Sequence, residues 1–127
     1  MTEKRTTTTI LHVEDNPDSR LLVRRVLEAE DYRVIEAGEA LVGIEIAKTQ
    51  RPDLILMDIC LPGMDGLEAT TRLREIEGFE SIPILAVTAY VLKDDREKAL
   101  QAGCSGYIKK PIDVDRLPAE IASFLQQ

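Results

Sequence analysis

Short apolar runs alternate along the chain with longer segments of mixed polarity. The most apolar run, LILM at residues 54–57, lacks the alternation expected of a half-exposed strand. An unbroken apolar run of this length is typical of a strand buried on both faces of a parallel sheet. Together with four similar segments it predicts strands at residues 10–13, 32–37, 54–57, 82–87 and 107–109.

Residues with helical spacing follow each predicted strand. Asn16 is expected to cap the first helix, with Pro17 in its first turn. A polar fourth helix is expected at residues 93–102, and residues 113–117 are expected to form a tight turn before a last helix that begins at Pro118. Core-facing positions are predicted for the first, second, third and last helices. They are, in that order, Leu22, Val23, Val26 and Leu27; Leu41, Ile44 and Ala47; Leu67, Thr70, Leu73 and Ile76; and Ile121, Phe124 and Leu125.

Five strands alternating with five helices predict a (βα)5 fold of the α/β class, because successive parallel strands need helical crossovers. At this size the favoured arrangement is a doubly wound, flavodoxin-like sheet with strand order 2-1-3-4-5 and helices on both faces. No repeat or linker indicates a second domain. Residues 9–127 are therefore predicted to form one domain after a flexible tail at residues 1–8.

Composition narrows the class of protein. The chain has 127 residues and a formal net charge of -7, which argues against DNA or an anionic membrane as its main partner. No apolar run approaches the roughly 20 residues of a membrane helix, and no secretory signal precedes the first strand. Cys60 and Cys104 form no metal-binding motif. A cytoplasmic protein is expected, and Met1 and the polar end suit a complete short chain.

Acidic residues follow two strands that the predicted order places side by side. Asp58 ends the third strand, and Glu14 and Asp15 follow the first. In open α/β sheets ligands bind at the carboxyl ends of the strands, near the point where the strand order reverses. Three carboxylates gathered there repel one another unless a cation joins them, and Mg²⁺ prefers oxygen ligands. The sequence therefore predicts a magnesium site at Glu14, Asp15 and Asp58.

The same edge is expected to carry the groups that phosphoryl transfer requires. An aspartate can attack phosphorus as a nucleophile, and the remaining work is positioning and charge neutralisation. Thr88 ends the fourth strand and Lys110 follows the fifth. A cis peptide bond before Pro111 would aim the ammonium group of Lys110 inward, although most such bonds are trans. With the ammonium group of Lys110 and the hydroxyl of Thr88 nearby, Asp58 is predicted to form an aspartyl phosphate.

From Ile10 to Leu125 the chain resembles the receiver domain of two-component response regulators, which has a CheY-like fold. The motifs that carry this resemblance are VEDN at residues 13–16, Asp58 with LPGMDG at residues 61–66, Thr88-Ala89, and YIKKP at residues 107–111. The resemblance extends to single-domain receivers of the cell-cycle and phosphorelay type through ILMDI, GCSGYI and KPID. Similar receivers are also attached to hybrid histidine kinases.

The resemblance implies a role for each motif residue. Asp58 would accept a phosphoryl group from a histidine of a kinase or phosphotransfer protein. Mg²⁺ would be held by Asp15, Asp58 and the main-chain carbonyl of Cys60, with Glu14 acting largely through a water. Lys110 and Thr88 would contact the phosphoryl oxygens.

The resemblance also implies a switch. Thr88 would move toward the phosphate, Tyr107 would turn inward, and the surface of the fourth helix, fifth strand and fifth helix would change for an unidentified downstream protein. The domain would promote its own phosphorylation and slow dephosphorylation without turning over another substrate, as a monomer or weak dimer. Cys60 and Tyr90 occupy variable positions that influence phosphate loss, and a bulky Tyr90 is expected to slow it.

Alternative functions remain open on the sequence. A receiver-like module that binds partners without phosphorylation, or a receiver cut from a hybrid histidine kinase, would share most of these features. A flavodoxin-like cofactor site is disfavoured because EDNPD at residues 14–18 places acids where a cofactor phosphate would bind. A nucleotide-binding P-loop motif is absent. His12 lies within a buried strand, so it is interpreted as a hydrogen-bonded core residue rather than a phosphodonor.

Overall fold

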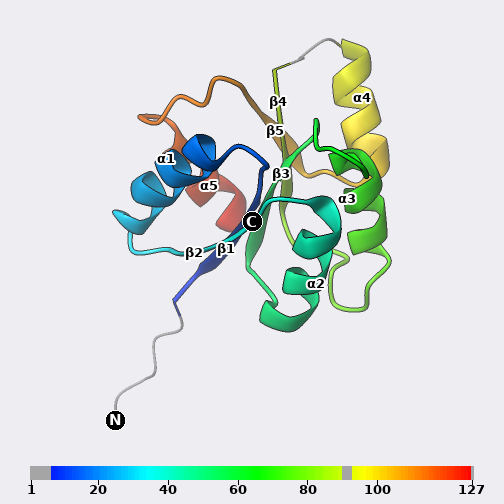
Figure 1. Cartoon of the computed structure of the whole chain (residues 1–127), viewed down its shortest axis with the longest axis horizontal. Helices are drawn as coiled ribbons and strands as arrows, with labels where there is room; N and C mark the ends of the chain where they lie inside the picture. The colour runs from blue at the N-terminus through cyan, green and yellow to red at the C-terminus, as the bar shows by residue number, and fades with distance from the viewer. Residues whose placement is uncertain (1–6, 90–92, 127) are drawn as a thin grey trace.

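The computed structural model describes residues 7–89 and 93–126, and these residues form a five-stranded sheet with helices on both sides (Figure 1). The elements are β1 (Thr9–Val13), α1 (Pro17–Glu28), β2 (Arg33–Ala37), α2 (Ala40–Gln50), β3 (Leu54–Asp58), α3 (Gly66–Arg74), β4 (Ile84–Thr88), α4 (Lys93–Ala102), β5 (Gly106–Lys109) and α5 (Leu117–Leu125). All strand pairs are parallel, in the order β2-β1-β3-β4-β5. The predicted (βα)5 fold and strand order are confirmed. Tyr90 and most of the predicted tail lie outside the described residues.

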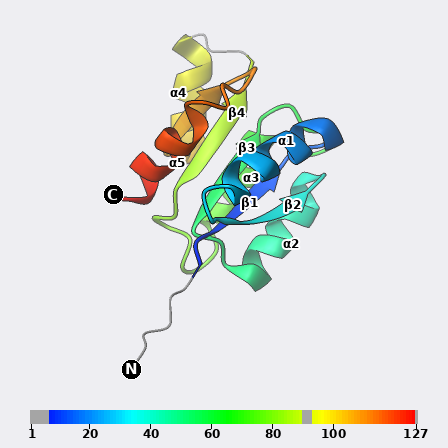
Figure 2. The ribbon, with the colours of Figure 1, turned by 90° about the vertical axis from the view of Figure 1, so that its left-hand side faces the viewer.

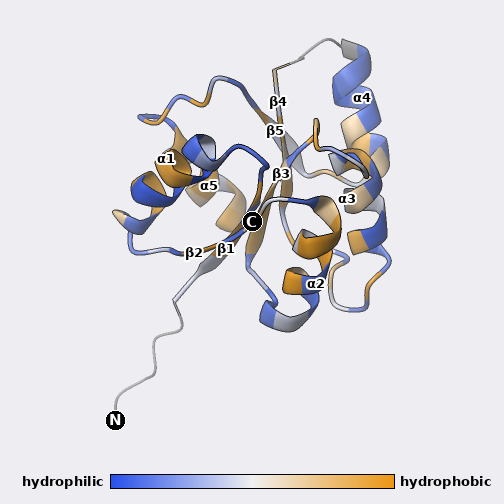
Figure 3. Cartoon of the chain, in the orientation of Figure 1, coloured by the Kyte–Doolittle hydropathy of each residue, from blue (hydrophilic) through white to orange (hydrophobic). Residues whose placement is uncertain are grey.

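The core has two layers, one on each face of the sheet. Helices α1 and α5 cover one face, and α2, α3 and α4 cover the other (Figures 1 and 2). Alternate residues of β3 therefore enter different layers: Leu54 and Leu56 pack with α1 and α5, while Ile55 and Met57 pack with α2 and α3. Figure 3 shows apolar residues along the central strands and polar residues on the outer helix surfaces. Burial on both faces explains the unbroken apolar sequence of β3.

Some apolar helix residues predicted to face the core are exposed instead. The buried positions of α1 are Val23 and Leu27, and Leu22 is 47% exposed. In α2 the buried positions are Ala40, Gly43, Ile44 and Ala47, and Leu41 is 57% exposed. Each helix contains more apolar residues than one stripe can bury, and the small residues of α2 allow it to lie close to the sheet.

Several boundaries differ from the predicted ones because of main-chain hydrogen bonding. Strand β2 begins at Arg33 rather than Tyr32, since the amide of Tyr32 donates to the carbonyl of Leu27 at the end of α1. Strand β4 begins at Ile84 rather than Ile82, because Pro83 has no amide hydrogen for the ladder. Helix α3 ends at Arg74, so Ile76 packs against the core from the following loop.

The last helix begins one residue earlier than predicted. The turn that precedes α5 is present, but Leu117 is already helical and Pro118 is its second residue. Leu117 is fully buried, Ile121 is buried as predicted, and Phe124 and Leu125 are half-buried. Among the described residues, no helix is both long and apolar enough to span a membrane.

Candidate functional site

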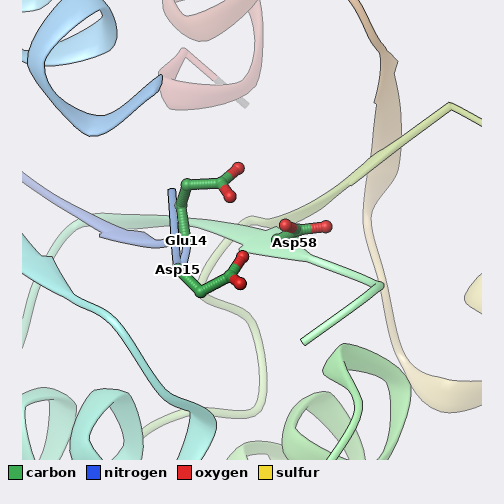
Figure 4. A group of neighbouring side chains, drawn as sticks. All are labelled: Glu14, Asp15 and Asp58. Carbon is green, nitrogen blue, oxygen red and sulfur yellow. The ribbon is translucent and has the colours of Figure 1, made fainter. Parts of the chain in front are cut away.

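Four strands bring the predicted site residues to one edge of the sheet. Asp58 and Thr88 are the last residues of β3 and β4, Glu14 directly follows β1, and Lys110 directly follows β5. Since all these strands are parallel, their carboxyl ends meet at the same edge, and β1 pairs directly with β3. The carboxylates of Glu14, Asp15 and Asp58 accordingly approach one another (Figure 4).

The three carboxylates have a geometry that suits a divalent cation. One oxygen of each lies within 4.8 Å of the others. Magnesium–oxygen distances of about 2.1 Å place opposite ligands about 4.2 Å apart, so small side-chain movements would bring these oxygens into one coordination shell. Glu14 and Asp58 are each 2% exposed, whereas Asp15 is exposed and leaves the site open to water. The donor set therefore fits Mg²⁺, which usually keeps several waters.

Lys110 supplies positive charge to this acidic cluster. Its Nζ donates to Asp58 Oδ2 at 3.0 Å and lies 3.1 Å from Glu14 Oε1. Burial by itself would lower the pKa of Lys110, but hydrogen bonds and charge attraction from Asp58 and Glu14 outweigh it and raise the pKa. The ammonium group therefore stays protonated at neutral pH. The Lys110–Pro111 peptide bond is cis.

Replacing Lys110 with methionine is expected to lower the free energy of unfolding by about 1–3 kcal/mol in metal-free buffer. Two buried carboxylates would lose their shared cation, and the loss stays moderate because 28% of the Lys110 side chain is exposed. Urea unfolding in EDTA measures the change, and added Mg²⁺ is expected to recover part of it. The matched control is Lys109→Met at the exposed neighbouring position. Equal losses in the two variants would contradict this account.

Main-chain contacts hold the two buried carboxylates in place. The amide of Cys60 donates to Asp58 Oδ1 at 3.0 Å, and the amide of Asn16 donates to Glu14 Oε2 at 3.1 Å. The Asn16 side chain also caps α1, as predicted, by accepting from the amides of residues 18 and 19. Arg20 Nη1 donates to the carbonyl oxygen of Glu14 at 2.7 Å. Sequence reasoning missed Arg20, whose position one turn into α1 was its only signal.

Gly66 is required by the close approach of α3 to the end of β3. A Cβ at this position would lie 2.1 Å from the carbonyl oxygen of Asp58 and 2.9 Å from the Cα of Ile59. The amide of Gly66 donates to the carbonyl of Ile59 at 3.0 Å, and Asp65 caps α3 through the amide of Glu68. The turn from residue 59 to residue 66 thus returns the chain tightly beneath Asp58.

The other predicted residues are placed less centrally. Thr88 is half-buried at the end of β4, and its carbonyl accepts the amide of Lys110 at 2.8 Å. Cys60 is exposed two residues after Asp58. Tyr107 lies in the middle of β5, where it is 37% exposed and borders a cavity beside α4 rather than the carboxylates. The described structure thus brings Glu14, Asp15, Asp58 and Lys110 together, with Thr88 next to them.

His12 is a buried residue of β1, as interpreted, but it lacks the expected hydrogen bonds. The side chain is 0% exposed, and neither ring nitrogen has a hydrogen-bond partner among the described residues. Burial lowers the pKa of His12 from 6.5 to about 4; Glu14 opposes this shift, while Lys110 and Arg20 add to it. The imidazole is therefore neutral at neutral pH and is shielded from any phosphodonor role.

His12→Leu is expected to reduce the sensitivity of the fold to acid. Between pH 6.5 and pH 4 the unfolded chain binds a proton at His12 that the folded chain excludes, so the wild type loses stability as the pH falls. The histidine contribution to this loss is at most about 3 kcal/mol. Urea unfolding at several pH values measures the difference between wild type and variant. A difference that stays constant over this range would rule out a neutral, buried His12.

Comparison with known proteins agrees with this geometry. The response regulator receiver domain family matches residues 10–122. The polar-differentiation response regulator DivK of Brucella ovis is 43% identical over 119 residues, which cover 94% of this chain and 97% of that protein. This relative is a response regulator of similar length.

Solved structures show the same fold. The receiver domain of the sensor histidine kinase PA1611 of Pseudomonas aeruginosa, with a magnesium ion coordinated in its active-site cleft, has a TM-score of 0.88 and 36% identity over 96% of this chain and 100% of that one. The BeF3-activated receiver domain of Klebsiella pneumoniae RstA has a TM-score of 0.85 and 30% identity over 94% of this chain and 100% of that one. The chain belongs to the receiver domain family of response regulators, the signalling domains of two-component systems.

Proposed function

We propose that Asp58 is the phosphoacceptor of a phosphorelay or two-component pathway. The observation that carries the proposal is the position of Lys110 Nζ, 3.0 Å from Asp58 Oδ2 and 3.1 Å from Glu14 Oε1, at the carboxyl end of β3. A fixed cation beside a carboxylate nucleophile supplies the charge neutralisation that phosphoryl transfer requires. Asp58 is only 2% exposed, so its carboxylate is held within the cluster when a donor approaches.

The proposed reaction transfers one phosphoryl group. A carboxylate oxygen of Asp58 attacks the phosphorus of a phosphohistidine, the P–N bond breaks, and the electron pair returns to the imidazole nitrogen, which takes a proton from solvent. The product is an acyl phosphate on Asp58. Lys110 would move its ammonium group to a phosphoryl oxygen, and the Thr88 hydroxyl would donate to another. Slow hydrolysis returns the free carboxylate, with no separate substrate turned over.

The acidic cluster is the proposed magnesium site. Asp15, Asp58 and the main-chain carbonyl of Cys60 would bind the ion directly, and Glu14 would act largely through a water. Bound Mg²⁺ would offset the charge that the phosphoryl group adds to the cluster. The Pseudomonas receiver domain with coordinated magnesium supports this assignment.

The proposed output is a change in the surface formed by α4, β5 and α5. Thr88 would shift toward the phosphoryl group, and Tyr107, now 37% exposed, would turn inward. The donor is a histidine kinase or phosphotransfer protein, and the recipient is a downstream protein. The domain is proposed to act through protein contacts, as a cytoplasmic monomer or weak dimer, and the net charge of -7 supports a partner other than DNA. The domain is proposed to extend over residues 9–127.

Acetyl phosphate tests the proposal without knowledge of the kinase. Incubation with Mg²⁺ is expected to add the mass of one phosphoryl group to the intact protein, and hydroxylamine is expected to remove it. EDTA is expected to prevent the addition. Peptide mapping after borohydride reduction of the acyl phosphate should place the modification at Asp58.

Two results would overturn the proposal. One is no hydroxylamine-labile adduct on the wild type. The other is an adduct that maps to a peptide without Asp58. The first result would favour a receiver-like module that binds its partners without phosphorylation, and the second would assign the phosphoacceptor to another residue.

A further inference from the structure

A cavity beneath α4 lies close to the candidate site. Its volume is about 100 Å³. It is bordered by four apolar residues, Ile59, Leu67, Ala86 and Ala99, by Thr88 and Tyr107, and by three charged residues of α4, Asp95, Arg96 and Lys98. Apolar cavities of roughly 150 Å³ in other proteins hold a benzene ring. The space beneath α4 has about two thirds of that volume, so it would take the ring of Tyr107 only if bordering side chains moved.

The ring of Tyr107 lies at the edge of this cavity. Tyr107 pairs with Ala86 in the sheet register, so the two side chains share the face that α4 covers. Ala86 is fully buried beneath α4, whereas Tyr107, on the edge strand β5, is 37% exposed. The ring has apolar surface on one side and solvent on the other.

Arg96 of α4 contacts this ring. Its guanidinium carbon lies 5.3 Å from the centroid of Tyr107, within the distance at which cations and aromatic faces attract. No carboxylate in the described parts of the chain forms an ion pair with Arg96. Arg96 borders the cavity but is exposed, so its guanidinium would lose hydration if it followed the ring in among Ile59, Leu67 and Ala99. The attraction is therefore strongest while Tyr107 is at the surface.

We propose that Arg96 is a positioning residue that holds Tyr107 outward and keeps the cavity beneath α4 free for the ring until the domain is phosphorylated. The inference rests on the proposed function, in which the inward turn of Tyr107 carries the signal. Because the contact favours the outward ring, its removal raises the ratio of inward to outward Tyr107, by at most about two- to fivefold. Arg96 thus sets the threshold of the switch from α4, without touching the carboxylates.

Fluorine NMR tests the proposal in the unphosphorylated protein. The chain has three tyrosines, so 3-fluorotyrosine labelling gives few signals, and Tyr107→Phe identifies the one from Tyr107. The difference in its chemical shift between H₂O and D₂O measures ring exposure. Arg96→Gln is expected to reduce this difference, whereas Arg96→Lys, which keeps the charge, is expected to retain most of it. Arg25→Gln, the same charge change on an exposed part of α1, is the matched control.

Beryllium trifluoride with Mg²⁺ provides a second measurement at the phosphorylation site. If the inward position of Tyr107 is coupled to that site, a variant with more inward Tyr107 binds the analogue more tightly. Arg96→Gln is then expected to bind it more tightly than the wild type, by at most about two- to fivefold. An unchanged ring exposure in Arg96→Gln, or an equal change in Arg25→Gln, overturns the role of Arg96. A changed exposure without a change in analogue affinity upholds the role of Arg96 and instead removes Tyr107 from the proposed switch.

Discussion

Asp58→Asn is expected to leave the domain folded but to abolish its phosphorylation by acetyl phosphate. The amide has nearly the volume of the carboxylate, and Lys110 keeps Glu14 as a partner at 3.1 Å, so the free energy of unfolding is expected to change by less than about 1 kcal/mol. The amide lacks the anionic oxygen that attacks phosphorus, so no acyl phosphate can form. Intact mass spectrometry after incubation with acetyl phosphate and Mg²⁺ measures the loss.

Asp15→Asn is the matched control for that substitution. It removes one acid from the same cluster but leaves the proposed acceptor in place. This variant is expected to become phosphorylated more slowly and to require more Mg²⁺, while its adduct stays labile to hydroxylamine. Adduct formation at the wild-type rate in Asp58→Asn would exclude Asp58 as the acceptor. If both variants lost phosphorylation completely at saturating Mg²⁺, the loss in Asp58→Asn would be explained equally well by a role of Asp58 in binding Mg²⁺.

Gly66→Ala is expected to have the largest effect on stability, lowering the free energy of unfolding by about 3 kcal/mol or more. The added methyl group would lie 2.1 Å from the carbonyl oxygen of Asp58 and 2.9 Å from the Cα of Ile59. Both neighbours are main-chain atoms, so no side chain can rotate to relieve the clash. The end of β3 would have to move, and phosphorylation is expected to fall with it. Urea unfolding and the acetyl phosphate assay measure the two effects.

Gly63 in the same turn provides the comparison. Its φ of 78° favours glycine, but a Cβ there would have no heavy atom within 4 Å. Gly63→Ala is therefore expected to cost about 1–2 kcal/mol, from backbone strain alone, and to preserve phosphorylation. Equal destabilisation by the two substitutions would mean that the segment from residue 59 to residue 66 can move away from Asp58 without penalty.

The placement of the acidic cluster was predictable because it depends on topology rather than on side-chain detail. Once β1 and β3 are neighbours in a parallel sheet, Glu14 and Asp58 must leave it at the same edge, and Lys110 leaves β5 at that edge too. The unbroken apolar sequence of β3 was sufficient to predict its burial. These features follow from strand period, crossover connections and strand order.

Features that depend on how closely elements pack could not be predicted in the same way. Leu22 and Leu41 are as apolar as their buried neighbours, and only the rotation of each helix against the sheet decides that they face solvent. The bond from Arg20 to the carbonyl of Glu14 and the contact of Arg96 with Tyr107 depend on rotamers of long side chains. The clash that excludes alanine at Gly66 depends on the path of a turn.

The amide of Lys110 donates to the carbonyl of Thr88 at 2.8 Å, so the main chains that carry the two proposed phosphoryl-binding side chains are joined directly. A shift of the end of β4 therefore changes the position of Lys110 as well. Tyr107 lies only three residues before Lys110 on β5. Under the proposed switch, Thr88 would respond to the phosphoryl group, and Tyr107 lies on the surface that partners recognise. One hydrogen bond and three strand residues, 107–109, connect these two positions. Communication across this domain would be short and local, and it would need no relay of core residues.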